Sequence, residues 1–132
     1  MTLYEFNRFC SELTSTTKVI QWGGAHVWKI GGKIFAIASH WGPNKKNTKL
    51  PEEGSKISFK CSDFSYSILI EQENIIPAPY LARAKWVQLE QSDALTDDDL
   101  KLYIEQAHSI ISAKLTKKLQ LELGVLPSQI EA

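Results

Sequence analysis

The first apolar residues of the chain recur at spacings of three and four. Thr2 precedes this pattern and Glu5 lies within it. Their spacing is that of a capping box, in which each side chain bonds the backbone N–H of the other residue. Together these features predict an amphipathic helix over roughly residues 3–14. Its buried side would carry Leu3, Phe6, Phe9, Cys10 and Leu13. The following stretch, STTKVIQW, breaks the helical spacing with β-branched and small polar residues.

Residues 26–38 predict a β-hairpin around the stretch VWKIGGKIFAI. Gly31 and Gly32 separate two apolar segments and permit the positive φ angles of a two-residue turn. Regular pairing outward from this turn places Trp28 opposite Phe35. The larger face, which we expect against the core, carries His26, Trp28, Ile30, Lys33, Phe35 and Ile37. The smaller face carries Val27, Lys29, Ile34 and Ala36.

The rest of the chain alternates between extended and helical patterns. KISFKC, residues 56–61, predicts a half-buried strand, and Ser62 or Asp63 can cap a helix over roughly 63–73. IIPAPY and KWVQLE, the second covering residues 85–90, are expected to be extended. Thr96 is expected to cap a long last helix that ends at Gly124. Its predicted buried stripe is Leu100, Ile104, Ala107, Ile111 and Leu115.

This order of elements predicts an α+β fold of two layers, an antiparallel sheet with helices on one face (α-β3-α-β2-α). The 132 residues, 43% hydrophobic and 23% charged, suit one globular domain over residues 1–124 with a tail at 125–132. No apolar run approaches the roughly 18 residues of a membrane span. With no apolar leader and two distant cysteines, we expect a cytoplasmic protein without a membrane partner.

The residues do not form a recognisable catalytic or metal motif. Gly32-Lys33 resembles the end of a phosphate-binding loop, but Val27 and Ile34 occupy the positions where that loop needs glycine and Ser/Thr. His26, His40 and His108 have no second ligand at metal-binding spacing, so no metal is expected. Cys10 lies on the apolar stripe and is expected to be a buried structural thiol. We therefore expect no catalytic residues and no cofactor.

The charges are balanced overall but unevenly distributed. The net charge is zero, whereas residues 1–61 hold nine basic and four acidic residues and the remainder holds six and eleven. This asymmetry allows a basic patch that would neutralise nucleic-acid phosphates. Ordinary solvated lysines are the alternative interpretation.

Four segments, in this order, resemble the MmcQ/YjbR family: QWGGAHVWKIGGKIFAI, KISFKC, IIPAPYLARAKWVQLE, and LTDDDL with AKLTKKLQ. The resemblance covers roughly residues 3–120. It implies a compact fold of helix, three strands, helix, two strands and helix, similar in shape to secretion chaperones and to CyaY-like (frataxin-like) folds. It also implies DNA binding through a double-wing arrangement, and it brings no catalytic residues. Ala107-His108 departs from the Ser-Tyr that the family often has in the last helix.

Three functional hypotheses follow. The leading one is a non-enzymatic module with weak, non-sequence-specific DNA affinity directed at the phosphate backbone. Its expected phosphate contacts are Lys29, Lys33, Lys45, Lys46, Arg83 and Lys85, with Trp41 or Trp86 stacking or wedging. The alternative is a chaperone-like protein-interaction domain that accepts a peptide at a sheet edge or beside Val27, Ile34 and Ala36. The third is a small-molecule enzyme using His26 or His108.

Overall fold

The computed structural model describes residues 1–40, 50 and 54–125, and within them it confirms the α+β class. Six strands form one antiparallel sheet in the order β1-β2-β3-β4-β6-β5. The elements are α1 (Leu3–Glu12), β1 (Thr16–Gln21), β2 (Ala25–Ile30), β3 (Lys33–Ser39), β4 (Lys56–Lys60), α2 (Asp63–Leu69), β5 (Ile75–Pro77), the 3-10 helix η1 (Ala82–Ala84), β6 (Trp86–Leu89), α3 (Asp97–Ser112) and α4 (Lys117–Leu123).

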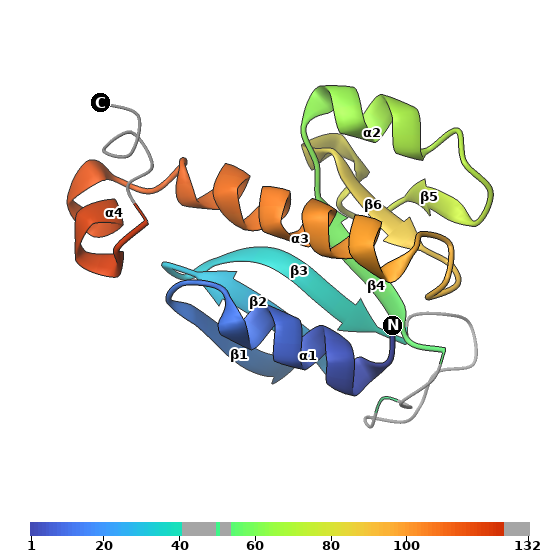
Figure 1. Ribbon diagram of the computed structural model, residues 1–132, viewed down its shortest axis with the longest axis horizontal. Coiled ribbons are helices and arrows are strands. Elements are labelled where there is room, and N and C mark those ends of the chain that lie inside the picture. Colours follow the sequence, from blue (N-terminus) through green and yellow to red (C-terminus); the bar gives the residue numbers. More distant parts are fainter. Residues whose placement is uncertain (41–49, 51–53, 126–132) are drawn as a thin grey trace.

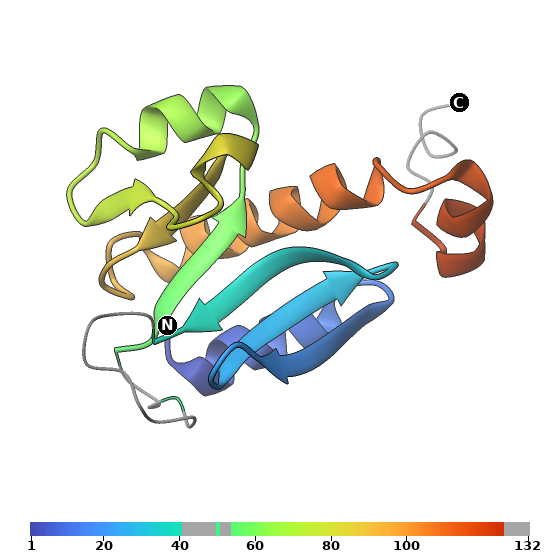
Figure 2. The same ribbon diagram turned by 180° about the vertical axis from the view of Figure 1, so that it is seen from behind.

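The helices cover one face of the sheet. In Figure 1, α1 lies in front of β1 and β2 while α3 crosses β3 and β4, and Figure 2 shows the sheet in front of both helices when seen from behind. The main core fills the space between these layers. It includes Phe6 of α1, Phe35 and Phe59 of the sheet, and Leu100 and Ile104 of α3.

Each described α-helix begins at a side chain that accepts a backbone hydrogen bond. Thr2 and Glu5 form the predicted capping box of α1. Ser62 and Thr96 cap α2 and α3 as predicted. The stripe predicted for the last helix is buried at all five positions, four of them in α3 and Leu115 just after it. These local signals act over three or four residues, which is why the sequence reveals them.

The predicted hairpin is present, but its register is wrong beyond Lys29. Lys29 pairs with Ile34, whereas Trp28 pairs with Ala36 instead of Phe35. Phe35 is therefore the extra residue of a β-bulge. Ala36 consequently joins Phe35 in the main core, and Ile37 moves to the opposite face.

The face of the sheet away from α1 and α3 carries a second, smaller apolar cluster. Val27 and Ile37 lie there, and Trp86 packs with them. Ala78 and Leu81, from the segment that leads into η1, complete this cluster. The smaller hairpin face is thus partly covered. Val27 and Ala36, two of the residues beside which the alternative hypothesis places a bound peptide, are fully buried.

Two elements differ from the predicted order. The stretch that breaks α1 forms β1, an additional strand at one edge of the sheet. The predicted last helix is two helices, because α3 ends at Ser112 and Thr116 caps α4. Gly124 ends α4 in a left-handed conformation, as predicted.

Candidate nucleic-acid interface

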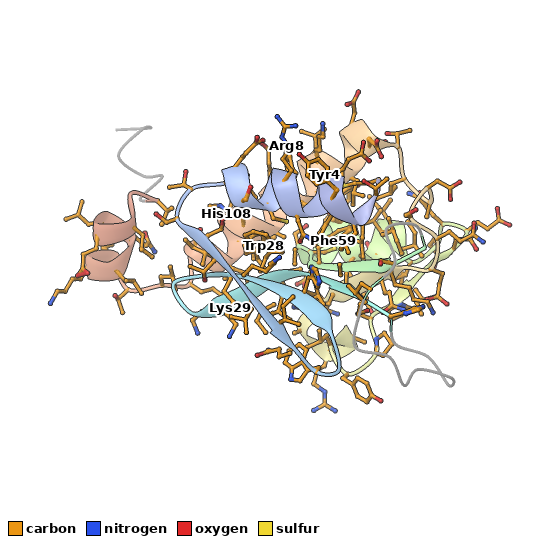
Figure 3. The ribbon with its side chains drawn as sticks, turned by 90° about the horizontal axis from the view of Figure 1, so that it is seen from below. Tyr4, Arg8, Trp28, Lys29, Phe59 and His108 are labelled. Atoms are coloured by element: carbon orange, nitrogen blue, oxygen red, sulfur yellow. The ribbon has the colours of Figure 1, made fainter. Side chains whose placement is uncertain are left out.

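Of the six predicted phosphate contacts, four lie in the described part of the chain, and Lys45 and Lys46 lie outside it. Lys29 and Lys33 point to opposite faces of the sheet, since Lys29 pairs with Ile34 and Lys33 with the core residue Ile30. Figure 3 shows Lys29 on the side of β2 away from α1. The hairpin pairing therefore separates these two charges, as the sequence predicts.

Arg83 and Lys85 come from the segment around η1. Arg83 is exposed, and Lys85 follows η1 in a left-handed conformation with φ of 64°. The ammonium group of Lys85 lies 5.0 Å from the centroid of the Tyr66 ring in α2, a cation–π contact. The carbonyl of Lys85 accepts a hydrogen bond of 2.9 Å from the N–H of Cys61, which joins this segment to the end of β4.

Lys60, the residue before Cys61, is the central residue of this basic region. Lys60 ends β4, is only 8% exposed, and donates a hydrogen bond from Nζ to the carbonyl oxygen of Ala84. Burial lowers the pKa of Lys60 most, and the charge of Lys114 lowers it further. Lys85 also lowers this pKa, while Asp63 opposes the shift. The partly buried ammonium of Lys60 thus has two like charges near it and one carboxylate.

The fold brings these three lysines together from distant parts of the sequence. Lys60 is the last residue of β4 and pairs with Trp86, directly after Lys85. Lys114 follows the end of α3, where Leu115 packs against the hairpin tip at Gly31. Lys60, Lys85 and Lys114 are called the lysine cluster below.

The predicted hairpin contacts flank the lysine cluster at the same end of the sheet. β3 and β4 are antiparallel, so β3 begins with Lys33 at the end where β4 finishes with Lys60. Alternation also puts Lys29 and Lys60 on the same face, two strands apart, with Ile34 of β3 between them. One end of the sheet therefore carries most of the described predicted contacts together with Lys60 and Lys114.

Sequence reasoning missed Lys60 and Lys114. Lys60 stands between Phe59 and Cys61 in an otherwise apolar strand end, and that position is the available signal that its stem is buried. Lys114 gives no such signal, because it is an exposed lysine at the end of a helix. Its nearness to Lys60 arises only from tertiary packing.

The predicted role of Trp86 as a wedge is wrong. Trp86 is 5% exposed and packs in the second apolar cluster, so its ring cannot stack on a base. Trp41 lies outside the described residues.

The two cysteines are buried thiols, as expected for Cys10. Burial raises the pKa of Cys61 to about 12 and that of Cys10 still further. Neither forms a thiolate readily, so nucleophilic chemistry is not supported at either position. Within the described residues, no group of three or more His, Cys, Asp or Glu side chains could hold a metal ion.

Two histidines connect elements of the fold. His26 Nδ1 lies 3.0 Å from Asn7 Nδ2, which joins β2 to α1. His108 Nε2 lies 2.9 Å from the carbonyl oxygen of Thr14, and its ring meets Phe35 edge-on at 5.3 Å. His108 therefore holds α3 to the turn after α1.

Solved structures contain the same fold. The chain is similar to the crystal structure of protein DR2400 of Deinococcus radiodurans, which carries the domain DUF419. The two share a TM-score of 0.75 and 17% sequence identity over 94% of this chain and 88% of that one. The YjbR family model matches residues 11–110, and the chain belongs to the YjbR family. No curated protein matches the sequence. None of the described helices has the length and apolarity needed to cross a membrane.

Proposed function

We propose that this protein is a non-enzymatic binding module that contacts the phosphate backbone of DNA through the lysine cluster. The observation that carries this proposal is the convergence of Lys60, Lys85 and Lys114 from three distant segments, around a Lys60 side chain whose stem is buried. Lys29 and Arg83 would extend the contact at the same end of the sheet. Lys33 points to the opposite face, so it would join them only if the duplex grips the hairpin tip. Lys45 and Lys46 remain predicted contacts.

The energetics of the lysine cluster favour an anionic ligand. Burial and the nearby charges of Lys114 and Lys85 disfavour the charged form of Lys60, and both effects lower its pKa. A phosphate group placed among these lysines would remove the repulsion and release counterions from the nucleic acid. Lysine ammonium groups bind phosphate as point charges, so the site would accept many backbone geometries.

The same arrangement predicts DNA binding with little preference for base sequence. Sequence is read through base edges or by side chains that wedge between bases, whereas phosphate contacts only position the protein. Burial of Trp86 removes the wedge that the sequence suggested within the described residues. The zero net charge further limits nonspecific affinity, so we expect binding that is measurable at low salt and weak at physiological salt.

Fluorescence anisotropy with a short labelled DNA duplex tests this proposal. The variant Lys85→Glu plus Lys114→Glu reverses two charges beside Lys60 and should weaken binding at low salt at least about tenfold. The matched control, Lys18→Glu plus Lys101→Glu, makes the same change in charge at exposed positions on β1 and near the start of α3. Equal losses in both double variants, or no binding by the unmodified protein, would overturn the proposal.

A further inference from the structure

β1 forms one edge of the sheet. β1 ends the sheet and pairs only with β2, so in the described part of the chain its outer backbone groups face no neighbouring strand. Four of its six residues are exposed. Val19 is 39% exposed and Ile20 52% exposed, and Trp22, just after the strand, is 52% exposed.

A groove lies beside this edge on the α1 side of the sheet. Its volume is about 390 Å³, and it is lined by Tyr4, Asn7, Arg8, Ser11, Lys18 and Trp28. The first four come from α1 at helical spacing, and Lys18 of β1 lies directly opposite Trp28 of β2. Figure 3 shows Trp28 on the side of β2 that faces α1.

The floor of the groove is fixed by hydrogen bonds. Trp28 Nε1 donates to Asn7 Oδ1 at 2.9 Å, and the amide of Asn7 reaches His26 at 3.0 Å. These bonds hold Trp28 and Asn7 in place, and side chains that are already positioned lower the entropic cost of binding.

The positive charge of the groove favours an acidic partner. Its lining contains Lys18 and Arg8 and no carboxylate. Arg8 Nε lies 3.5 Å from Glu12, and both side chains are more than 60% exposed, so this ion pair is weak. A carboxylate placed opposite Lys18 on an added strand would be favourable, whereas a lysine there would be repelled.

We propose that β1 and this groove bind an extended acidic segment of a partner protein as an additional strand. Backbone hydrogen bonds to β1 would supply affinity, and alternate side chains would supply specificity. Acidic side chains would lie on the α1 side, beside Lys18 and the groove. Apolar side chains would lie on the other side, beside Val19. This proposal is independent of the lysine cluster, because Lys18 and Val19 lie on β1 at the edge of the sheet, whereas Lys60 ends β4 in its interior.

A second copy of this chain fits the edge less well. In an antiparallel pair of β1 strands, directly opposed residues share a face of the sheet. A register centred on Lys18 would set two lysines against each other. A register centred on Val19 avoids that clash but pairs Lys18 with Ile20, so neither lysine gains a carboxylate. An acidic segment satisfies Lys18 and the backbone together.

Nuclear magnetic resonance titration with two six-residue peptides tests the proposal. One peptide alternates Glu and Val, and the other alternates Lys and Val. The acidic peptide should produce saturable shifts at residues 17–21 and at the Trp28 indole N–H, with slower hydrogen exchange along β1. The basic peptide should bind at least about tenfold more weakly, by about 1.4 kcal/mol.

Two variants complete the test. Lys18→Glu should reverse the preference between the peptides, and Lys118→Glu in α4 should leave it unchanged. Three results would overturn the proposal: no saturable shift, equal binding of both peptides, or protection of β1 that rises with protein concentration alone. The last would assign the edge to a second copy of the chain.

Discussion

Asn7 of α1 accepts a hydrogen bond from the indole N–H of Trp28 in β2 at a distance of 2.9 Å. Because an indole N–H can only donate, this contact fixes the amide orientation and makes the Asn7 nitrogen the donor to His26 Nδ1. One side chain thus joins the first helix to two positions of the same strand. Asn7 lines the groove beside β1 and is not part of the lysine cluster, so it belongs to only one of the two candidate surfaces.

Asn7→Ala should destabilise the fold by about 1–2 kcal/mol, because a largely buried indole N–H loses its acceptor. Urea unfolding measures this loss. Ser11→Ala is the control one turn further along α1, where the hydroxyl bonds only the carbonyl of Arg8 in the same helix. Similar losses in the two variants would show that the bond between Asn7 and Trp28 contributes no special stability.

Gly31→Ala should cost more stability than Gly32→Ala. Both glycines have positive φ, of 59° and 81°, so alanine is strained at either position. A Cβ at Gly31 would also lie 2.7 Å from Cδ1 of the buried Leu115, whereas a Cβ at Gly32 would meet nothing within 4 Å. We expect about 1 kcal/mol at Gly32 and roughly 1–3 kcal/mol more at Gly31 by thermal unfolding. Equal costs would mean that the hairpin tip does not pack against the end of α3.

The buried thiols predict a loss of stability at alkaline pH. Their pKa is raised in the folded state, to about 12 for Cys61 from an ordinary 9.0, so the unfolded chain releases thiol protons first. Their contribution is therefore complete below about pH 9 and is lost as pH rises from 9 towards 12. Cys10→Ala plus Cys61→Ala should flatten this decline in urea unfolding between pH 8 and 10. An unchanged slope would contradict the burial of the thiols.

Lys114→Gln should stabilise the protein while it weakens DNA binding. Removing this charge lessens the repulsion on Lys60, whose pKa is lowered first by burial and then by the charge of Lys114. The gain should be small, roughly 0.5 kcal/mol, and should vanish in about 1 M salt. Lys101→Gln, within α3, is the control, since Lys101 lies over the Phe9 ring at 5.9 Å and its loss removes an attraction. A loss of stability in Lys114→Gln would contradict the repulsion.

Local signals in the sequence predict much of the fold. Thr2, Ser62 and Thr96 mark helix starts because their hydroxyls act within three residues. The glycine pair marks the hairpin for a similar reason. The sequence did not reveal β1, because an edge strand exposed on both faces has no alternation of apolar and polar residues.

Other features depend on contacts that no local pattern contains. The bulge at Phe35 moves Ile37 to the other face, although the apolar run IFAI is continuous. Apolar spacing continues through residues 113–116, which conceals the end of α3 and the new cap at Thr116. The sequence indicated Arg83 and Lys85 because they precede Trp86 in a predicted strand. Lys60 and Lys114 come near each other only in the folded chain.

The salt dependence of DNA binding tests the central claim most directly. Each phosphate neutralised adds about 0.9 to the magnitude of the slope of log Kobs against log salt concentration, so three to five contacts predict a slope of roughly −3 to −5. Lys85→Glu plus Lys114→Glu should reduce that magnitude by about 2, while Lys18→Glu plus Lys101→Glu should leave it unchanged. An absence of binding by the unmodified protein at about 20 mM salt, or the same slope in both double variants, would contradict the lysine cluster as a DNA-binding site.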